Sequence, residues 1–209
     1  MALTNAYSTI DEYRSALQIR DVDDEDRLTV ALNAASRQID KHCGRRFWQD
    51  GTVKVRTYHA EDSWTCVVDD ISTTTGLIVK TDEANTGAFG TTLTISTNFV
   101  VEPLNAAAET PVRPYEQIVI VDTLGGTFPM TSRAGVQVTA KFGWPAVPDD
   151  VKLATIVQAQ MLYKAGDAAL GVLQGGIDGN SFRVGRIHPT VVGLLEDYVR
   201  LHLPTVRRS

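Results

Sequence analysis

The sequence predicts an α+β protein: a small helical bundle built from both chain ends, with an inserted antiparallel β-sheet region. Apolar residues recur at helical spacing from Leu28 to Ile39 and again across 149–164. Between about residues 50 and 147 the pattern changes to alternating apolar and polar positions. Gly, Pro, Asp and Asn separate the short β-branched segments of that region, as is typical of antiparallel sheets.

Two helices are expected near the N-terminus. Thr9 and Glu12 have the spacing of a capping box, in which each side chain accepts a hydrogen bond from the other residue's backbone N–H. The second helix is predicted from about Asp23 to His42, with a single apolar stripe. Gly44 supplies its C-terminal stop.

Six short strands are expected in the inserted region. The segment from Val136 to Phe142 alternates most regularly and predicts a half-buried strand. Two further segments flank the polar turn 82–90 and predict a hairpin. The six predicted strands are 53–57, 65–68, 77–80, 92–95, 117–122 and 136–142.

Helices return after residue 148. The segment 149–164 is apolar around most of its circumference, which predicts a central helix packed on several sides. Residues 165–187 are rich in glycine and predict a mobile loop. A last helix is expected from His188, with Pro189 in its first turn, to Pro204. The domain prediction is therefore a helical core of residues 1–48 and 148–209, a β region of 49–147, and a basic C-terminal tail of 205–209.

Composition limits the possible functions. The 209 residues carry a formal net charge of −5 and a pI of about 5.3, which argues against a surface that grips nucleic-acid phosphates. An acidic surface would repel DNA and would still allow DNA to slide past it. The opening residues lack the pattern of a signal peptide, and no apolar run approaches the roughly 18 residues of a membrane span. A protein made in the cytoplasm and without a membrane association is expected.

No catalytic motif stands out, so we predict no catalytic residue, no cofactor and no metal. A zinc site from His42, Cys43, His59 and Cys66 is conceivable, but neighbouring side chains at a helix end diverge by about 100°. A disulfide between the two cysteines is open on count alone. A small metal-dependent hydrolase remains an alternative if His59 and His188 meet acidic residues in the fold.

The acidic stretch 21–26 is interpreted as the start of a helix, where carboxylates favour the positive end of the macrodipole. A calcium loop would need alternating oxygen ligands, a glycine and a distal Glu, and that pattern is missing.

Aromatic residues occur at both junctions between helix and sheet. Arg45 and Arg46 precede Phe47 and Trp48, a combination that could bind single-stranded nucleic acid by charge and stacking. We favour packing for the two aromatic residues, with the arginines facing solvent or a partner's carboxylates. Trp144 has two interpretations, a core anchor or an interface hot spot, and the core is favoured.

Two blocks of the sequence resemble the head–tail connector, or head-completion adaptor, proteins of long-tailed bacteriophages. The first runs from Tyr7-Ser8-Thr9-Ile10-Asp11-Glu12-Tyr13 through the helix at Leu28–Ile39 to Cys43-Gly44-Arg45-Arg46-Phe47. The second is Phe142-Gly143-Trp144-Pro145, followed by Val147-Pro148 and Val151. The closing pattern from Val191 to Arg200 is also similar to the family's terminal helix.

The resemblance implies a structural role in the virion neck. Such proteins form a homo-oligomeric ring, usually of twelve copies, beneath the portal, where the ring extends the DNA channel and receives a stopper or the tail. On this chain the portal-facing residues would be Tyr198, Arg200, Arg207 and Arg208. The subunit interface would include Arg45, Arg46 and Trp144. Another neck or tail-terminator protein is the structural alternative.

Overall fold

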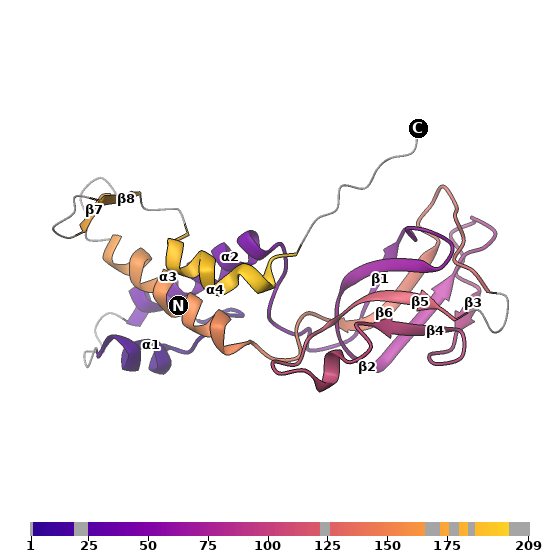
Figure 1. Cartoon of the computed structure of the whole chain (residues 1–209), viewed down its shortest axis with the longest axis horizontal. Coiled ribbons are helices and arrows are strands. Elements are labelled where there is room, and N and C mark those ends of the chain that lie inside the picture. The colour runs from indigo at the N-terminus through magenta and orange to yellow at the C-terminus, as the bar shows by residue number, and fades with distance from the viewer. Residues whose placement is uncertain are drawn as a thin grey trace. The chain divides into compact units, whose positions relative to one another are not determined.

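The computed structural model describes residues 2–18, 25–121, 126–165, 172–175, 180–183 and 187–200. The chain divides into two compact units (Figure 1). The helical unit comprises residues 1–47 and 147–209, and the sheet unit comprises residues 48–146. The predicted α+β class is confirmed, since helices come from both ends of the chain and an antiparallel sheet lies between them in sequence. No described helix is both long enough and apolar enough to cross a lipid bilayer.

The helical unit begins with α1 (Ile10–Leu17) and α2 (Glu25–Cys43). The predicted capping box is confirmed: the Thr9 hydroxyl accepts from the Glu12 N–H at 3.1 Å, and the Glu12 carboxylate accepts from the Thr9 N–H at 2.8 Å. Leu28, Leu32 and their neighbours on the apolar stripe are buried against Tyr13 of α1. The stop at Gly44 is also confirmed, since this residue has φ 63° directly after α2.

Helix α3 (Asp149–Ala165) packs against both α2 and α4 (Pro189–Leu195). The Gln158 side chain joins the three helices. Its amide nitrogen donates to the Gln38 carbonyl oxygen at 2.7 Å, and its oxygen accepts from the His188 N–H at 3.0 Å. Because Gln158 is 1% exposed, these bonds satisfy an amide that would be costly to bury unpaired.

The last helix differs from its prediction. Pro189 does occupy the first turn, and the His188 ring caps it by accepting from the Thr190 N–H at 3.2 Å. The helix then tightens into the 3₁₀ turn η3 (Glu196–Tyr198), and Val199 is extended. The prediction that it would run to Pro204 is therefore wrong. The Arg200 N–H donates to the Cys43 carbonyl oxygen at 2.8 Å. It therefore bonds the end of α2 and does not continue the last helix by another turn.

Within the glycine-rich segment 165–187, two short strands are described. Strand β7 (Val172–Gly175) pairs antiparallel with β8 (Asn180–Arg183). The predicted loop thus contains a hairpin, and its remaining residues 166–171, 176–179 and 184–186 lie outside the described part. The basic tail 205–209 lies outside it as well.

The sheet unit contains six antiparallel strands in the order β1-β6-β2-β5-β4, with β3 paired to β2. These strands are β1 (Lys54–Tyr58), β2 (Thr65–Thr81), β3 (Thr91–Leu93), β4 (Phe99–Glu102), β5 (Tyr115–Ile120) and β6 (Val136–Phe142). A short 3₁₀ turn, η1 (Ala106–Ala108), lies between β4 and β5. In this order β1 and β4 are the two end strands, and β3 forms a further edge because it pairs with β2 alone.

Two strand predictions need correction. The segments 65–68 and 77–80 belong to one 17-residue strand, β2, which pairs with β5 through its first half and with β6 from Ile71 onward. The polar run between them hid this continuity, and irregular register along β2 accommodates the change of neighbour. Strand β4 was missed because it follows the polar turn Ser96–Asn98, which obscures its four-residue apolar pattern.

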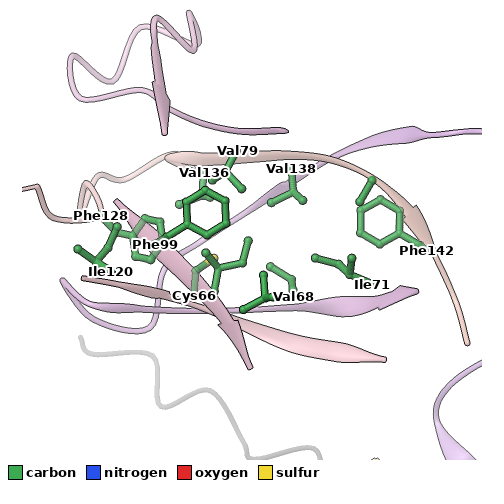
Figure 2. Packing of buried hydrophobic residues seen from close by; sticks show 13 residues of the cluster. Cys66, Val68, Ile71, Val79, Phe99, Ile120, Phe128, Val136, Val138 and Phe142 are labelled. Atoms are coloured by element: carbon green, nitrogen blue, oxygen red, sulfur yellow. The ribbon is translucent and has the colours of Figure 1, made fainter. Parts of the chain in front are cut away.

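The core of the sheet unit lies between its strands (Figure 2). Alternate residues of β6, Val136, Val138, Ala140 and Phe142, are all fully buried, as the alternation predicted. They meet residues from β2, β4 and β5 and Phe128 from the segment before β6. All 13 buried members of this cluster belong to residues 48–146, so the unit has a core of its own.

The backbone of the sheet unit packs closely around Gly143. This residue has φ +106°, and a Cβ placed there would overlap the Trp48 carbonyl oxygen. Its N–H donates to the Asp70 carbonyl oxygen at 2.7 Å, while the Asp50 N–H donates to the Phe142 carbonyl oxygen at 2.8 Å. The glycine in the Phe-Gly-Trp-Pro block is therefore required by backbone packing.

Candidate functional site

A polar stripe on α2 binds the residues that precede α1. Asn33, Ser36, Arg37 and Asp40 share one face of the helix because they are spaced by three, one and three residues. The Asn33 side-chain oxygen accepts from the Thr4 N–H at 3.0 Å. The Ser36 hydroxyl accepts from the Tyr7 N–H at 3.2 Å and donates to the Leu32 carbonyl at 2.8 Å.

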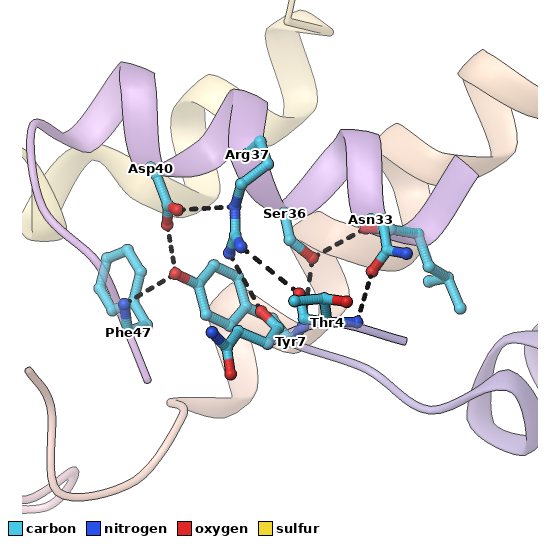
Figure 3. Close-up of polar contacts among 9 residues, drawn as sticks. Thr4, Tyr7, Asn33, Ser36, Arg37, Asp40 and Phe47 are labelled. Carbon is cyan, nitrogen blue, oxygen red and sulfur yellow. Dashed lines mark hydrogen bonds and ion pairs between the residues drawn. The ribbon is translucent and has the colours of Figure 1, made fainter. Parts of the chain in front are cut away.

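Tyr7 is the centre of this arrangement (Figure 3). Its hydroxyl donates to the Asp40 carboxylate and accepts from the Phe47 N–H at 2.8 Å. Arg37 pairs with the same carboxylate at 2.9 Å, and its guanidinium lies 5.6 Å from the centre of the Tyr7 ring. One buried phenol thus joins the segment before α1, the end of α2 and Phe47 in the turn after α2.

Phe47 extends these contacts to the C-terminal segment. Its ring meets the Tyr7 ring edge to face at 5.6 Å and the Tyr198 ring at 5.8 Å. The Tyr198 hydroxyl donates to an Asp150 carboxylate oxygen at 3.1 Å. We call Tyr7, Asp40, Phe47, Asp150 and Tyr198 the terminal anchor, because they fix the chain just before its last residues.

The electrostatics of the terminal anchor follow from burial. Burial raises the pKa of Asp40 above its usual range, although the Tyr7 hydroxyl and Arg37 partly offset the shift. Burial and the Asp40 carboxylate together raise the pKa of Tyr7 far above its ordinary value, so this phenol keeps its proton. Burial also raises the pKa of the Cys43 thiol to about 12, which makes it a weak nucleophile.

The residues predicted to contact partners differ in how exposed they are. Tyr198 is 6% exposed and belongs to the terminal anchor, and Arg200 follows it half-exposed beside the end of α2. Arg45 and Arg46 are half-exposed in the turn after α2, and the Arg46 charge is close enough to lower the pKa of Asp40. Arg207 and Arg208 lie outside the described residues.

Trp144, predicted for the subunit interface, is 2% exposed in the sheet unit. Its side chain therefore presents almost no surface to another molecule, and the structure matches the favoured interpretation of Trp144 as a core anchor.

The candidate metal and catalytic residues are divided between the two units. His42 and Cys43 belong to the helical unit, whereas His59 and Cys66 belong to the sheet unit. No group of three or more His, Cys, Asp or Glu side chains suited to a metal ion occurs among the described residues. Both thiols are free and buried, and the His188 ring is used as a helix cap.

The terminal anchor was not predicted from the sequence. Asn33, Ser36, Arg37 and Asp40 form a polar stripe at helical spacing on α2, beside the apolar stripe that the sequence predicted. That spacing was the available signal. Nothing local pairs it with Tyr7 or Tyr198, because the contacting residues are separated by up to about 150 positions.

No protein-family model and no curated protein sequence matches the chain. Its fold is similar to chains in solved structures of a gene transfer agent (GTA) particle. One is from the neck of the empty particle computed with C6 symmetry, with TM-score 0.54, 19% identity, and coverage of 97% of this chain and 94% of that chain. A second, from the neck of the native particle computed with C12 symmetry, has TM-score 0.54, 18% identity and the same coverage. A third, from the virion of the native particle, has TM-score 0.53 and 18% identity over 98% of this chain and 96% of that chain.

Proposed function

We propose that this protein is a structural adaptor subunit of a phage neck, which forms a ring between the portal and the stopper or tail and extends the DNA channel. The observation that carries the proposal is the likeness of fold over almost the whole chain to neck chains of a phage-like particle. The sequence blocks around Tyr7–Phe47 and Phe142–Val151 support it independently. A ring of twelve copies agrees with the C12 symmetry with which one of those necks was computed.

The terminal anchor fixes the start of the C-terminal segment to the helical unit. Tyr198 acts from inside the helical unit, where its ring contacts Phe47 and its hydroxyl bonds Asp150 of α3, while the Arg200 N–H bonds Cys43 at the end of α2. Arg200, Arg207 and Arg208 then supply positive charge for acidic residues of the portal. Arg45 and Arg46, in the turn between α2 and Phe47, would contact carboxylates of a neighbouring copy. Genomic DNA passes through the ring without sequence-specific contacts.

The test uses the full chain and the portal protein encoded with it. Mixing the two should give complexes with a ring on the portal in negative-stain images. The substitution Arg207→Glu with Arg208→Glu should weaken portal binding about tenfold or more, because like charges across an interface oppose association.

A matched control reverses a basic residue of the sheet unit. Arg113→Glu changes an exposed arginine that pairs with Glu109 at 3.1 Å, and it should leave portal binding unchanged. A chain that stays monomeric at every concentration, with and without portal, would refute the adaptor role. Rings that bind tail proteins but not the portal would instead favour a tail-terminator.

A further inference from the structure

The two end strands of the sheet unit, β1 and β4, lie at edges of opposite charge. The pair β1–β6 carries Lys54, Arg56 and Lys141 and no carboxylate. Arg56 pairs with Asp69 of β2, so Lys54 is the basic residue of β1 that is available to another chain. The pair β4–β5 carries Glu102 and Glu116 and no basic residue. This separation occurs in a unit with 11 acidic and 6 basic residues, so the basic edge stands out against an acidic background.

Backbone pairing leaves both edges open in the described part of the chain. Strand β1 pairs with β6 alone. Strand β4 pairs with β5, and its other side has an isolated bridge from Ile95 to Phe99, its first residue. Edge strands present unpaired N–H and C=O groups that can pair with another chain.

The basic edge also carries exposed apolar surface. Val55 of β1 is 60% exposed and lies opposite Thr139 of β6, which in turn lies opposite Ile78 of β2, 44% exposed. Paired residues of neighbouring strands share a face, so these side chains form one row across the outside of the sheet. Val53, just before β1, is 44% exposed and within 3.3 Å of a Cβ placed at Gly76, which extends the apolar surface along β2.

We propose that the β1 edge is the docking surface for the β4 edge of a second copy of this chain. Lys54 disfavours pairing of two β1 edges, and Glu102 disfavours pairing of two β4 edges, because like charges would face each other. Pairing of β1 with β4 brings Lys54 and Glu102 together and is heterologous, the contact type that generates a ring. The inference rests on the proposed function for the ring, and it names the strands through which the copies associate.

Cysteine cross-linking tests the contact directly. Both native thiols are fully buried, so an introduced cysteine reacts selectively. With Lys54 opposite Glu102 in an antiparallel pair, position 56 lies opposite position 100 on the same face. Arg56→Cys in one preparation of the full chain and Val100→Cys in another should therefore form a disulfide-linked dimer when mixed, with and without portal protein. Lys54→Glu or Glu102→Lys should each lower the yield about tenfold, and the two changes together should restore it to within about twofold. Lys152→Glu, on α3 of the helical unit, is the control and should have no effect.

Each outcome is decisive. A dimer from Arg56→Cys alone would show β1–β1 pairing and overturn the proposal, as would a cross-link to the portal protein only. Rings in negative-stain images without the mixed cross-link would overturn the edge contact and leave the adaptor role standing. The mixed cross-link without any portal-bound ring would support the edge contact and refute the adaptor role. Absence of both would refute both.

Discussion

Replacing Tyr7 with Phe removes one oxygen atom from the terminal anchor and nothing else. The Asp40 carboxylate then loses a donor, and the buried Phe47 N–H loses its acceptor. A hydrogen bond to a charged group contributes about 1.5–3 kcal/mol, and a buried N–H left unpaired costs about 1–3 kcal/mol. Since Arg37 still pairs with Asp40, we expect Tyr7→Phe to lower the free energy of unfolding by about 3 kcal/mol.

Urea denaturation followed by circular dichroism at 222 nm measures this loss in the helices. With an m value of about 2 kcal/mol/M, the midpoint should fall by about 1.5 M. Fluorescence gives a separate signal for the sheet unit, because Trp48, Trp64 and Trp144 all belong to it. The helical signal should shift further than the fluorescence.

The matched control is Tyr13→Phe in the same unit. Tyr13 is fully buried, and its hydroxyl has no hydrogen-bond partner among the described residues. Removing an unpaired buried hydroxyl should be neutral or stabilising. If Tyr7→Phe and Tyr13→Phe changed stability by the same amount, the hydrogen bonds assigned to Tyr7 would not stabilise the unit.

The cost of Tyr7→Phe should also depend on pH. Burial raises the pKa of Asp40, and the Tyr7 hydroxyl partly offsets this rise by stabilising the carboxylate. The hydroxyl therefore stabilises the fold most when Asp40 is ionised, and its contribution falls as the pH drops through the raised pKa of Asp40. Because bonds to charged groups are roughly twice as strong as neutral ones, the part of the cost that comes from the Asp40 bond should fall by about half once Asp40 is protonated. The part that comes from the Phe47 N–H stays, so the total cost should fall to about 2 kcal/mol. A cost that is equal at pH 7 and pH 4 would contradict this assignment.

Three further predictions concern stability and reactivity. Gly143→Ala should destabilise the sheet unit by about 4 kcal/mol or more, because its Cβ overlaps the Trp48 carbonyl, whereas Gly51→Ala, with open space around it, should change stability by less than about 0.5 kcal/mol in the fluorescence-monitored urea titration. Thr9→Ala should cost about 1 kcal/mol by circular dichroism, through loss of the capping box. Both native thiols should resist Ellman's reagent at pH 8 until urea unfolds the chain, since burial raises the pKa of each to about 12.

The helices could be predicted from the sequence because their signals are local. The Thr9–Glu12 box, the Gly44 stop and Pro189 in a first turn each depend on residues within one helical turn. The end of the last helix could not be predicted in this way. It is set by the bond from the Arg200 N–H to the Cys43 carbonyl, which lies far away in sequence.

The sheet was harder to predict because its strands change partners. The middle of β2, Asp69–Thr75, is polar and carries no alternation, so the sequence divides it into two strands. Its continuity depends on β5 binding the first half and β6 binding the second, and both partners are remote in sequence. The candidate surfaces share this difficulty: β1 and β4 are end strands only because β6, β2 and β5 lie between them, which is a property of strand order and not of their residues.

The two units also differ in when they can fold. The terminal anchor joins Tyr7 to Phe47 and Tyr198, so the helical unit cannot complete it until almost the whole chain has been made. The sheet unit has all 13 residues of its buried cluster within 48–146, which is a sufficient length for an independent domain. We therefore expect a fragment of residues 48–146 to fold alone, with a dispersed amide NMR spectrum and a cooperative urea transition followed by fluorescence. Gly143→Ala in the same fragment supplies an unfolded reference. A fragment whose spectrum matches that reference would show that the sheet unit needs the helical unit, and that the two cores are not independent.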